Sequence, residues 1–153
     1  MKKELNIVIL GASLWCAGFI LAPFLSGTAA ELIYRIYSVV CHQFESRSFR
    51  LHGAPLAVCI RCTSIYLSFV LTLLLLRLWS PLRERKVHTA VILFVTALPM
   101  SVDGLLTLTG EYQATDASRI LTGSLFGAGM AALLHQPLSD TVRSLFFKER
   151  PIS

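Results

Sequence analysis

Four apolar segments dominate this sequence, and each is long enough to cross the hydrocarbon core of a membrane, which is about 30 Å thick. They cover about residues 5–25, 63–79, 87–108 and 120–134. Because lipid offers no hydrogen bonds to the backbone, each span must satisfy its own N–H and C=O groups as a helix. Hydrophobic residues make up 54% of the chain and charged residues only 15%, a balance that a soluble domain of this size could not bury. The sequence therefore predicts an all-α integral membrane bundle of four transmembrane helices, with residues 1–153 as a single transmembrane domain.

The distribution of basic residues predicts the orientation of this bundle. Nine of the 14 Lys and Arg residues fall on the side of the two termini and the 80–88 loop. The positive-inside rule places that side in the cytoplasm and the segments 26–62 and 109–118 outside, in a bacterial or archaeal cytoplasmic membrane. We expect the first span to be an uncleaved anchor, because it is long and residues 27–30 form only a weak cleavage site.

The net charge of +5 does not indicate a nucleic-acid partner. The basic residues lie beside the apolar spans without interleaved aromatic residues, where membrane topology and anionic lipids account for them. The expected partner is the lipid bilayer, and no nucleic acid.

Residues 29–40 predict a short helix that lies in the membrane interface. Ile33, Ile36, Tyr37 and Val40 recur at helical spacing, so one face of the helix is apolar. This helix would deliver the next residues of the chain to the membrane surface.

The outward segment carries Cys41-His42 near one end and the Cys59-x-x-Cys62 pair at the other. Thiolates and an imidazole are the ligands that zinc prefers, and a Cys-x-x-Cys pair supplies two of them to one tetrahedral ion. The sequence predicts a metal-binding loop for zinc rather than iron, with Cys41, Cys59 and Cys62 as ligands and His42 as the favoured fourth. Neighbouring side chains such as Cys41 and His42 reach one ion only where the backbone bends.

Two other roles for the cysteines remain open. Cys59-x-x-Cys62 has the form of a thiol–disulfide exchange site, in which Arg61 would stabilise a thiolate, and electrons could pass to a quinone. The quinone-coupled disulfide-forming membrane proteins carry a second cysteine pair, which the 109–118 loop lacks. A purely structural disulfide would leave one of the three outward cysteines unpaired. Cys16, in the middle of the first span, is expected to be a packing residue.

Asp103 lies within the third span, where an ionisable residue is costly and is usually paired or functional. Arg61 and Arg119 are its expected partners. Beside a metal, Asp103, Arg61 and Arg119 would suit catalysis on an anionic, lipid-borne substrate, because arginines bind phosphate and carboxylate groups. A non-catalytic membrane scaffold or transport accessory is a further alternative.

The fourth span contains Gly123-x-x-x-Gly127, a spacing that allows close helix packing. The expected use is a contact within the bundle, and a homo-oligomer through the same residues is possible. His88 and His135 are expected at the surface, near the cytoplasmic ends of spans.

Six short motifs distinguish this chain: Cys41-His42-Gln43, Arg47-Ser48-Phe49, Cys59-x-Arg61-Cys62-Thr63, Ile65-Tyr66, Asp103-Gly104 and Arg119-x-x-Thr122-Gly123. Together they resemble a family of small prokaryotic membrane proteins, domain of unknown function 2085. The resemblance covers about residues 35–130 and departs at Ser64, where the family pattern has glycine. It implies a compact helical membrane protein with a shared outward site, and it implies no particular reaction. The further candidate residues for a substrate pocket are Gln43, Arg47, Ser48, Thr63 and Tyr66.

Overall fold

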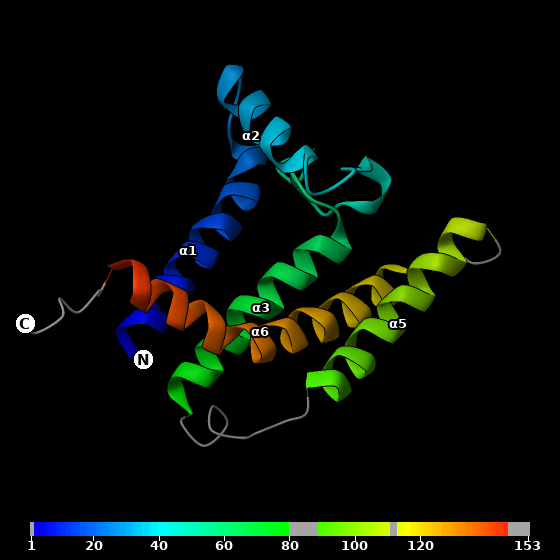
Figure 1. Ribbon diagram of the computed structural model, residues 1–153. Coiled ribbons are helices and arrows are strands. Elements are labelled where there is room, and N and C mark those ends of the chain that lie inside the picture. The colour runs from blue at the N-terminus through cyan, green and yellow to red at the C-terminus, as the bar shows by residue number, and fades with distance from the viewer. Residues whose placement is uncertain (1, 80–88, 111–112, 147–153) are drawn as a thin grey trace, which may run out of the picture.

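The computed structural model describes residues 2–79, 89–110 and 113–146, and these residues form a helical bundle (Figure 1). The helices are α1 (Lys2–Leu21), α2 (Thr28–Ser38), α3 (Ile60–Leu78), α5 (Thr89–Thr109) and α6 (Asp116–Phe146). Short 3-10 turns cover Ala22–Phe24 and Glu45–Arg47, and β1 (Arg50–Leu51) pairs with β2 (Ala54–Pro55) as a small antiparallel hairpin. This architecture confirms the all-α membrane bundle.

Within the described residues, four helices are long and apolar enough to cross a membrane. The spans are Lys3–Phe24, Ile60–Leu78, Val91–Thr109 and Asp116–Phe146. Three of them agree with the predicted spans to within a few residues, although residues 87 and 88 of the predicted third span lie outside the described residues. The many exposed leucines and phenylalanines on these helices are the side chains that a bilayer would cover.

The fourth span is longer than the sequence predicted. Helix α6 has 31 residues, or about 46 Å, and continues through His135 and Pro137. The expectation that His135 lies at the surface is wrong, because its side chain is only 8% exposed and its Nδ1 lies 2.8 Å from the carbonyl oxygen of Ala132. Polar residues near the predicted end of the span were therefore no sign of a helix end. His88 lies outside the described residues.

Helix α6 contacts α1, α3 and α5, and its most extensive contact is with α3. A Cβ atom placed on Gly123 would lie 2.8 Å from the backbone oxygen of Arg61, and one on Gly127 would overlap the backbone oxygen of Ile65. Gly129 meets the side chain of Thr96 on α5 in the same way. The expected glycine contact within the bundle is confirmed. Because α3 of the same chain already packs against Gly123 and Gly127, these glycines are not free to contact a second copy in the same way. A homo-oligomer through them stays a prediction.

The segment between α2 and α3 folds over the end of α1. Phe19 is fully buried there, and the Tyr37 hydroxyl donates a hydrogen bond of 2.5 Å to the carbonyl of Trp15. The Gln43 side-chain amide donates to the carbonyls of Tyr34 (2.7 Å) and Ala57 (2.8 Å), which ties the chain after α2 to the chain before α3. These contacts fix where Cys41 meets the start of α3.

Helix α2 confirms the predicted helix between the first two spans. Leu32 and Ile36, one turn apart on this helix, are exposed. The predicted apolar face is wrong in part, because Tyr37 is buried, Ile33 packs against the core, and Val40 lies beyond the end of the helix. An exposed apolar face of this kind suits a helix at a membrane surface, and its position in the interface stays a prediction.

Candidate metal centre

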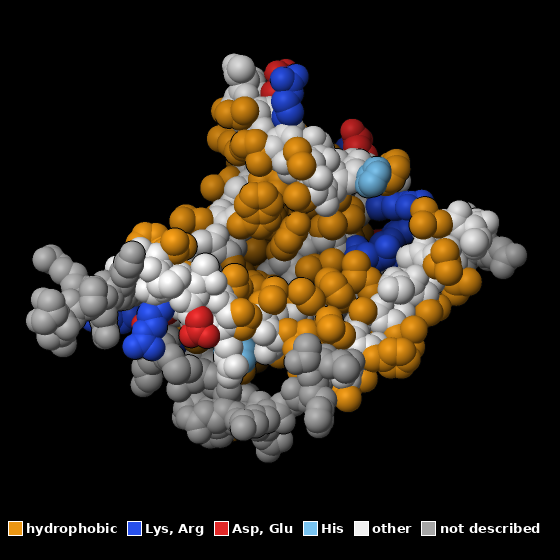
Figure 2. Space-filling view, in the orientation of Figure 1, with side chains coloured by type: hydrophobic (Ala, Val, Ile, Leu, Met, Phe, Trp, Pro, Cys, Tyr) orange, Lys and Arg blue, Asp and Glu red, His pale blue; other side chains and the backbone are white. Residues whose placement is uncertain are grey.

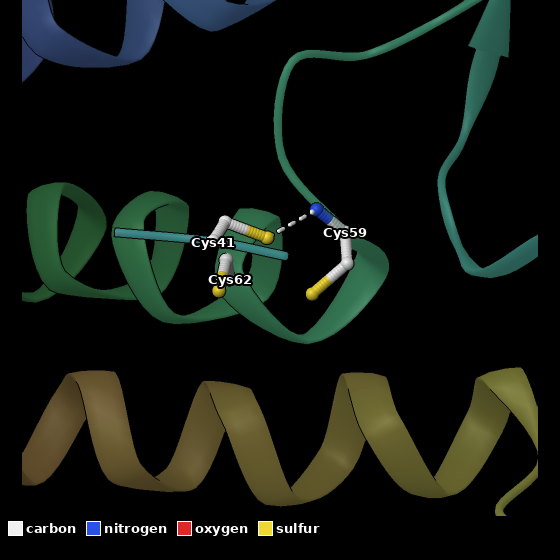
Figure 3. Close-up of side chains that lie close together, drawn as sticks. All are labelled: Cys41, Cys59 and Cys62. Atoms are coloured by element: carbon white, nitrogen blue, oxygen red, sulfur yellow. Dashed lines mark hydrogen bonds between the residues drawn. The ribbon is translucent and has the colours of Figure 1, made fainter. Parts of the chain in front are cut away.

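Three cysteine sulfurs meet at one end of the bundle (Figure 3). Cys41 follows α2, Cys59 is the N-cap of α3, and Cys62 lies in the first turn of α3. Their Sγ atoms all lie within 4.8 Å of one another, and none of them is in a disulfide. A tetrahedral zinc with bonds of about 2.3 Å holds its sulfurs about 3.8 Å apart, so small side-chain movements would bring all three onto one ion.

The electrostatics of this sulfur cluster favour one negative charge on Cys41. Hydrogen bonds from the side chains of Cys59 and then Cys62, together with the Cys59 backbone N–H at 3.2 Å, lower the pKa of Cys41 to about 2. The Cys59 thiol, which shares its proton with Cys41, has a raised pKa. A second thiolate would add a like charge at close range, and a bound cation would remove this cost.

His42 lies outside the sulfur cluster. Its side chain is exposed, and its ring stacks on Phe44 with the centroids 6.0 Å apart and the planes at 5°. Cys41 and His42 are adjacent, so their side chains leave the backbone in different directions, and only Cys41 turns toward α3. The fourth ligand stays a prediction.

Arg61 lies between the two cysteines of α3 and forms an ion pair with Asp103 of α5. The guanidinium Nη2 donates to Asp103 Oδ2, and the carboxylate is 92% buried. This confirms the expected pairing of Asp103 and selects Arg61 as the partner. Arg119 instead pairs with Asp116 at 3.0 Å, one turn earlier on α6.

A cavity of about 390 Å³ adjoins the sulfur cluster, between the segment after α2 and helices α3, α5 and α6. Its polar walls come from Cys41, Cys59, Cys62, His42, Gln43, Arg47, Arg61, Thr107 and Arg119. Figure 2 shows basic side chains gathered in the hollow between the cysteine-bearing segment and α5. The structure thus places most of the predicted site residues in the wall of one cavity. Asp103 does not line the cavity, but it contacts Arg61, which does.

Three of the predicted pocket residues have other contacts and do not line this cavity. The Ser48 hydroxyl donates to the carbonyl of Phe44 (3.0 Å), and the Thr63 hydroxyl donates to the carbonyl of Cys59 (3.1 Å). Tyr66 packs against Trp15 and Phe19. These side chains hold the turns and the helices that present the cysteines.

Sequence reasoning missed the contribution of α5 to the cavity wall. Met100, Thr107 and Leu108 line the cavity, and the Thr107 hydroxyl donates to the carbonyl of Asp103 (2.6 Å). The useful signal was helical spacing, since Met100 and Thr107 lie three residues before and four residues after Asp103 and therefore share its face.

Comparison with known proteins supports the resemblance seen in the motifs. A family described as predicted membrane protein, DUF2085, matches residues 41–133, which is more than half of the chain and contains the whole sulfur cluster. An uncharacterised protein of Methanocaldococcus jannaschii is 29% identical over 136 residues, which cover 83% of this chain and 87% of that protein. No solved structure matches the chain significantly. The chain therefore belongs to the DUF2085 family of predicted membrane proteins.

Proposed function

We propose that this multi-pass membrane protein binds zinc at an outward-facing site and acts there on an anionic, lipid-borne substrate. The observation that carries the proposal is the meeting of Cys41, Cys59 and Cys62, whose sulfurs lie within 4.8 Å of one another at the wall of a cavity. Soft thiolate ligands of this kind select zinc, copper(I) or iron–sulfur clusters over magnesium and calcium.

The donor set suits a metal that takes part in chemistry. Catalytic zinc sites have three protein ligands and keep the fourth position for water or substrate, whereas structural sites are closed by four ligands. His42 borders the same cavity, so it is the candidate to fill the fourth position when no substrate is bound. When bound, the metal would polarise an oxygen of the substrate.

The arginines of the cavity supply the preference for an anion. Arg47, Arg61 and Arg119 all line it, and a guanidinium binds phosphate or carboxylate oxygens through paired hydrogen bonds. Asp103 is the positioning residue of this group, because it holds the Arg61 guanidinium beside the cysteines through the ion pair.

In the proposed topology both termini are cytoplasmic, and a reporter-fusion map would test this orientation.

The second candidate function is thiol–disulfide exchange. Cys59 and Cys62 would be the exchanging pair, and Cys41, whose sulfur lies within 4.8 Å of both, would be the resolving thiol. Oxidation of the Cys59 and Cys62 thiols to one disulfide releases two protons and two electrons, which a membrane quinone would accept to become a quinol.

Elemental analysis and a thiol count on one sample distinguish the two functions. The protein is purified in detergent without chelator or reductant, beside the variants Cys59→Ser and Cys16→Ser. The metal site predicts one zinc per chain in the wild type and in Cys16→Ser, none in Cys59→Ser, and cluster thiols that react only after chelation. A metal-free sample that gains two free thiols on reduction would reject the zinc site in favour of exchange chemistry.

A further inference from the structure

A second cavity of about 450 Å³ adjoins the first near the start of α6. Arg47, Thr107 and Arg119 line both cavities, so they form the wall that the two share. The second cavity is completed mainly by small and polar residues, namely Ser46, Gln113, Gly110 and Ala114. We call the first cavity the cysteine chamber and the second the polar chamber.

The shared wall is basic, and its positive charge is only partly neutralised. Among the described residues, Arg47 forms no ion pair, and its guanidinium carbon lies 5.3 Å from the centre of the Phe44 ring. Arg119 is 12% exposed, while its partner Asp116 is 63% exposed, so water screens that carboxylate. Within the described part of the chain, no carboxylate lines either chamber. The wall therefore favours an anion.

The cysteine chamber has an apolar side that reaches the surface of the bundle. Val40, Ile65, Met100 and Leu108 line it. Leu108 lies near the end of the candidate span Val91–Thr109 and is 85% exposed, so the apolar side of the chamber continues onto the exposed surface of α5. This apolar surface suits the hydrocarbon chain of a lipid.

We propose that the two chambers form one site for a lipid phosphate, with the phosphate held between Arg47 and Arg119 and its hydrocarbon chain along the apolar side of the cysteine chamber. This inference rests on the proposed function, because it names the substrate class and the phosphate position of the same site. A phosphate accepts paired hydrogen bonds from each guanidinium. Since Arg47 and Arg119 border both chambers, this position also places the phosphate beside the sulfur cluster.

The test measures binding of dioctanoyl phosphatidic acid, a short lipid with a terminal phosphate, to the full chain in maltoside detergent by isothermal titration calorimetry. Arg47→Gln and Arg119→Gln should each weaken binding about tenfold or more, because each removes charge-assisted hydrogen bonds. The matched control is Arg50→Gln, an exposed arginine of the same segment that lines neither chamber, and it should leave binding unchanged. Arg119→Lys should recover part of the loss, which separates a direct contact from a folding defect.

Inorganic phosphate alone distinguishes a lipid site from a site for the free anion. It should bind at least tenfold more weakly than the lipid, because the apolar side adds nothing to its affinity. Equal affinity for the two ligands, or wild-type lipid binding by Arg47→Gln and Arg119→Gln, would overturn the proposal, as would absence of lipid binding. Zinc content, measured on the same samples, reports on the metal site separately: lipid binding without zinc rejects only the metal, and zinc without lipid binding rejects only this inference.

Discussion

Two groups of ionisable side chains meet at the start of α3, an ion pair and the sulfur cluster, and they differ in how their charge is neutralised. Arg61 pairs with Asp103, so each charge neutralises the other within the chain. Cys59 and Cys62, on either side of Arg61, meet Cys41 in a cluster that holds several ionisable groups and no positive charge of its own. The ion pair is complete without a partner molecule, whereas a cation would complete the sulfur cluster.

Their positions relative to the cavity follow the same division. The cysteines form part of the cavity wall, whereas Asp103 contacts Arg61 and does not line the cavity. A buried polar residue in a span therefore marks either a contact that holds helices together or a site that faces a ligand, and only the surrounding geometry separates the two.

Replacing Cys41 should abolish zinc binding. Cys41→Ser removes one of three thiolates, and the loss should exceed the roughly 10–100-fold decrease in affinity that removal of a supporting outer residue causes. Competition with a chromogenic chelator measures the affinity. The control is Cys16→Ala, which removes a buried thiol from α1 outside the cluster and should bind zinc as the wild type does. Wild-type affinity in Cys41→Ser would exclude this residue as a ligand.

Breaking the ion pair should reduce stability while leaving the metal site filled. Asp103→Asn leaves the half-buried Arg61 without a counter-charge and should lower the free energy of unfolding by about 3 kcal/mol, measured by denaturation in detergent. Asp116→Asn, which breaks the exposed pair with Arg119, should cost only about 0.5 kcal/mol. A loss of zinc in Asp103→Asn under conditions where it is folded would show that the two groupings are not independent.

Zinc affinity should rise with pH. The hydrogen bond to Cys41 raises the pKa of Cys59, so this thiol carries a proton at neutral pH that the metal must displace. Cys41, with its pKa lowered to about 2, is already a thiolate and releases none. Below the raised pKa of Cys59, each displaced proton makes the affinity about tenfold higher per pH unit. Titrations in buffers of different ionisation enthalpy count the protons, and binding that releases no proton would contradict this charge distribution.

The sequence predicted the fold well because the spans depend on local composition. Long apolar runs need no knowledge of their neighbours, and a Cys-x-x-Cys pair at a helix start brings its two sulfurs together by local geometry. The predicted fourth span ended before His135, because a polar residue there suggested the end of the apolar segment. His135 is instead buried inside the bundle, and the sequence does not show which helices pack beside it.

The partner of Asp103 could not be chosen from sequence for the same reason. Arg61 is 42 residues away and Arg119 only 16, yet the packing of the helices gives the pair to Arg61. The contribution of Thr107 and Leu108 to the cavity also depends on how α5 lies against α6. Local patterns thus located the cysteines of the sulfur cluster, and contacts between helices defined the space around them.

Replacement of His42 tests the fourth coordination position. His42→Ala should leave zinc at one per chain, because three thiolates hold the ion, and should lower its affinity by about tenfold at most. The structure motivates this limit, since the His42 ring stacks on Phe44 outside the sulfur cluster. His52→Ala, on the exposed turn between β1 and β2, is the matched control and should have no effect. If His42→Ala loses zinc as completely as Cys41→Ser, the imidazole is a full ligand and the site is closed by four protein groups. If the affinity changes little, the fourth position belongs to water or substrate, which is the arrangement that a metal acting on a bound lipid requires.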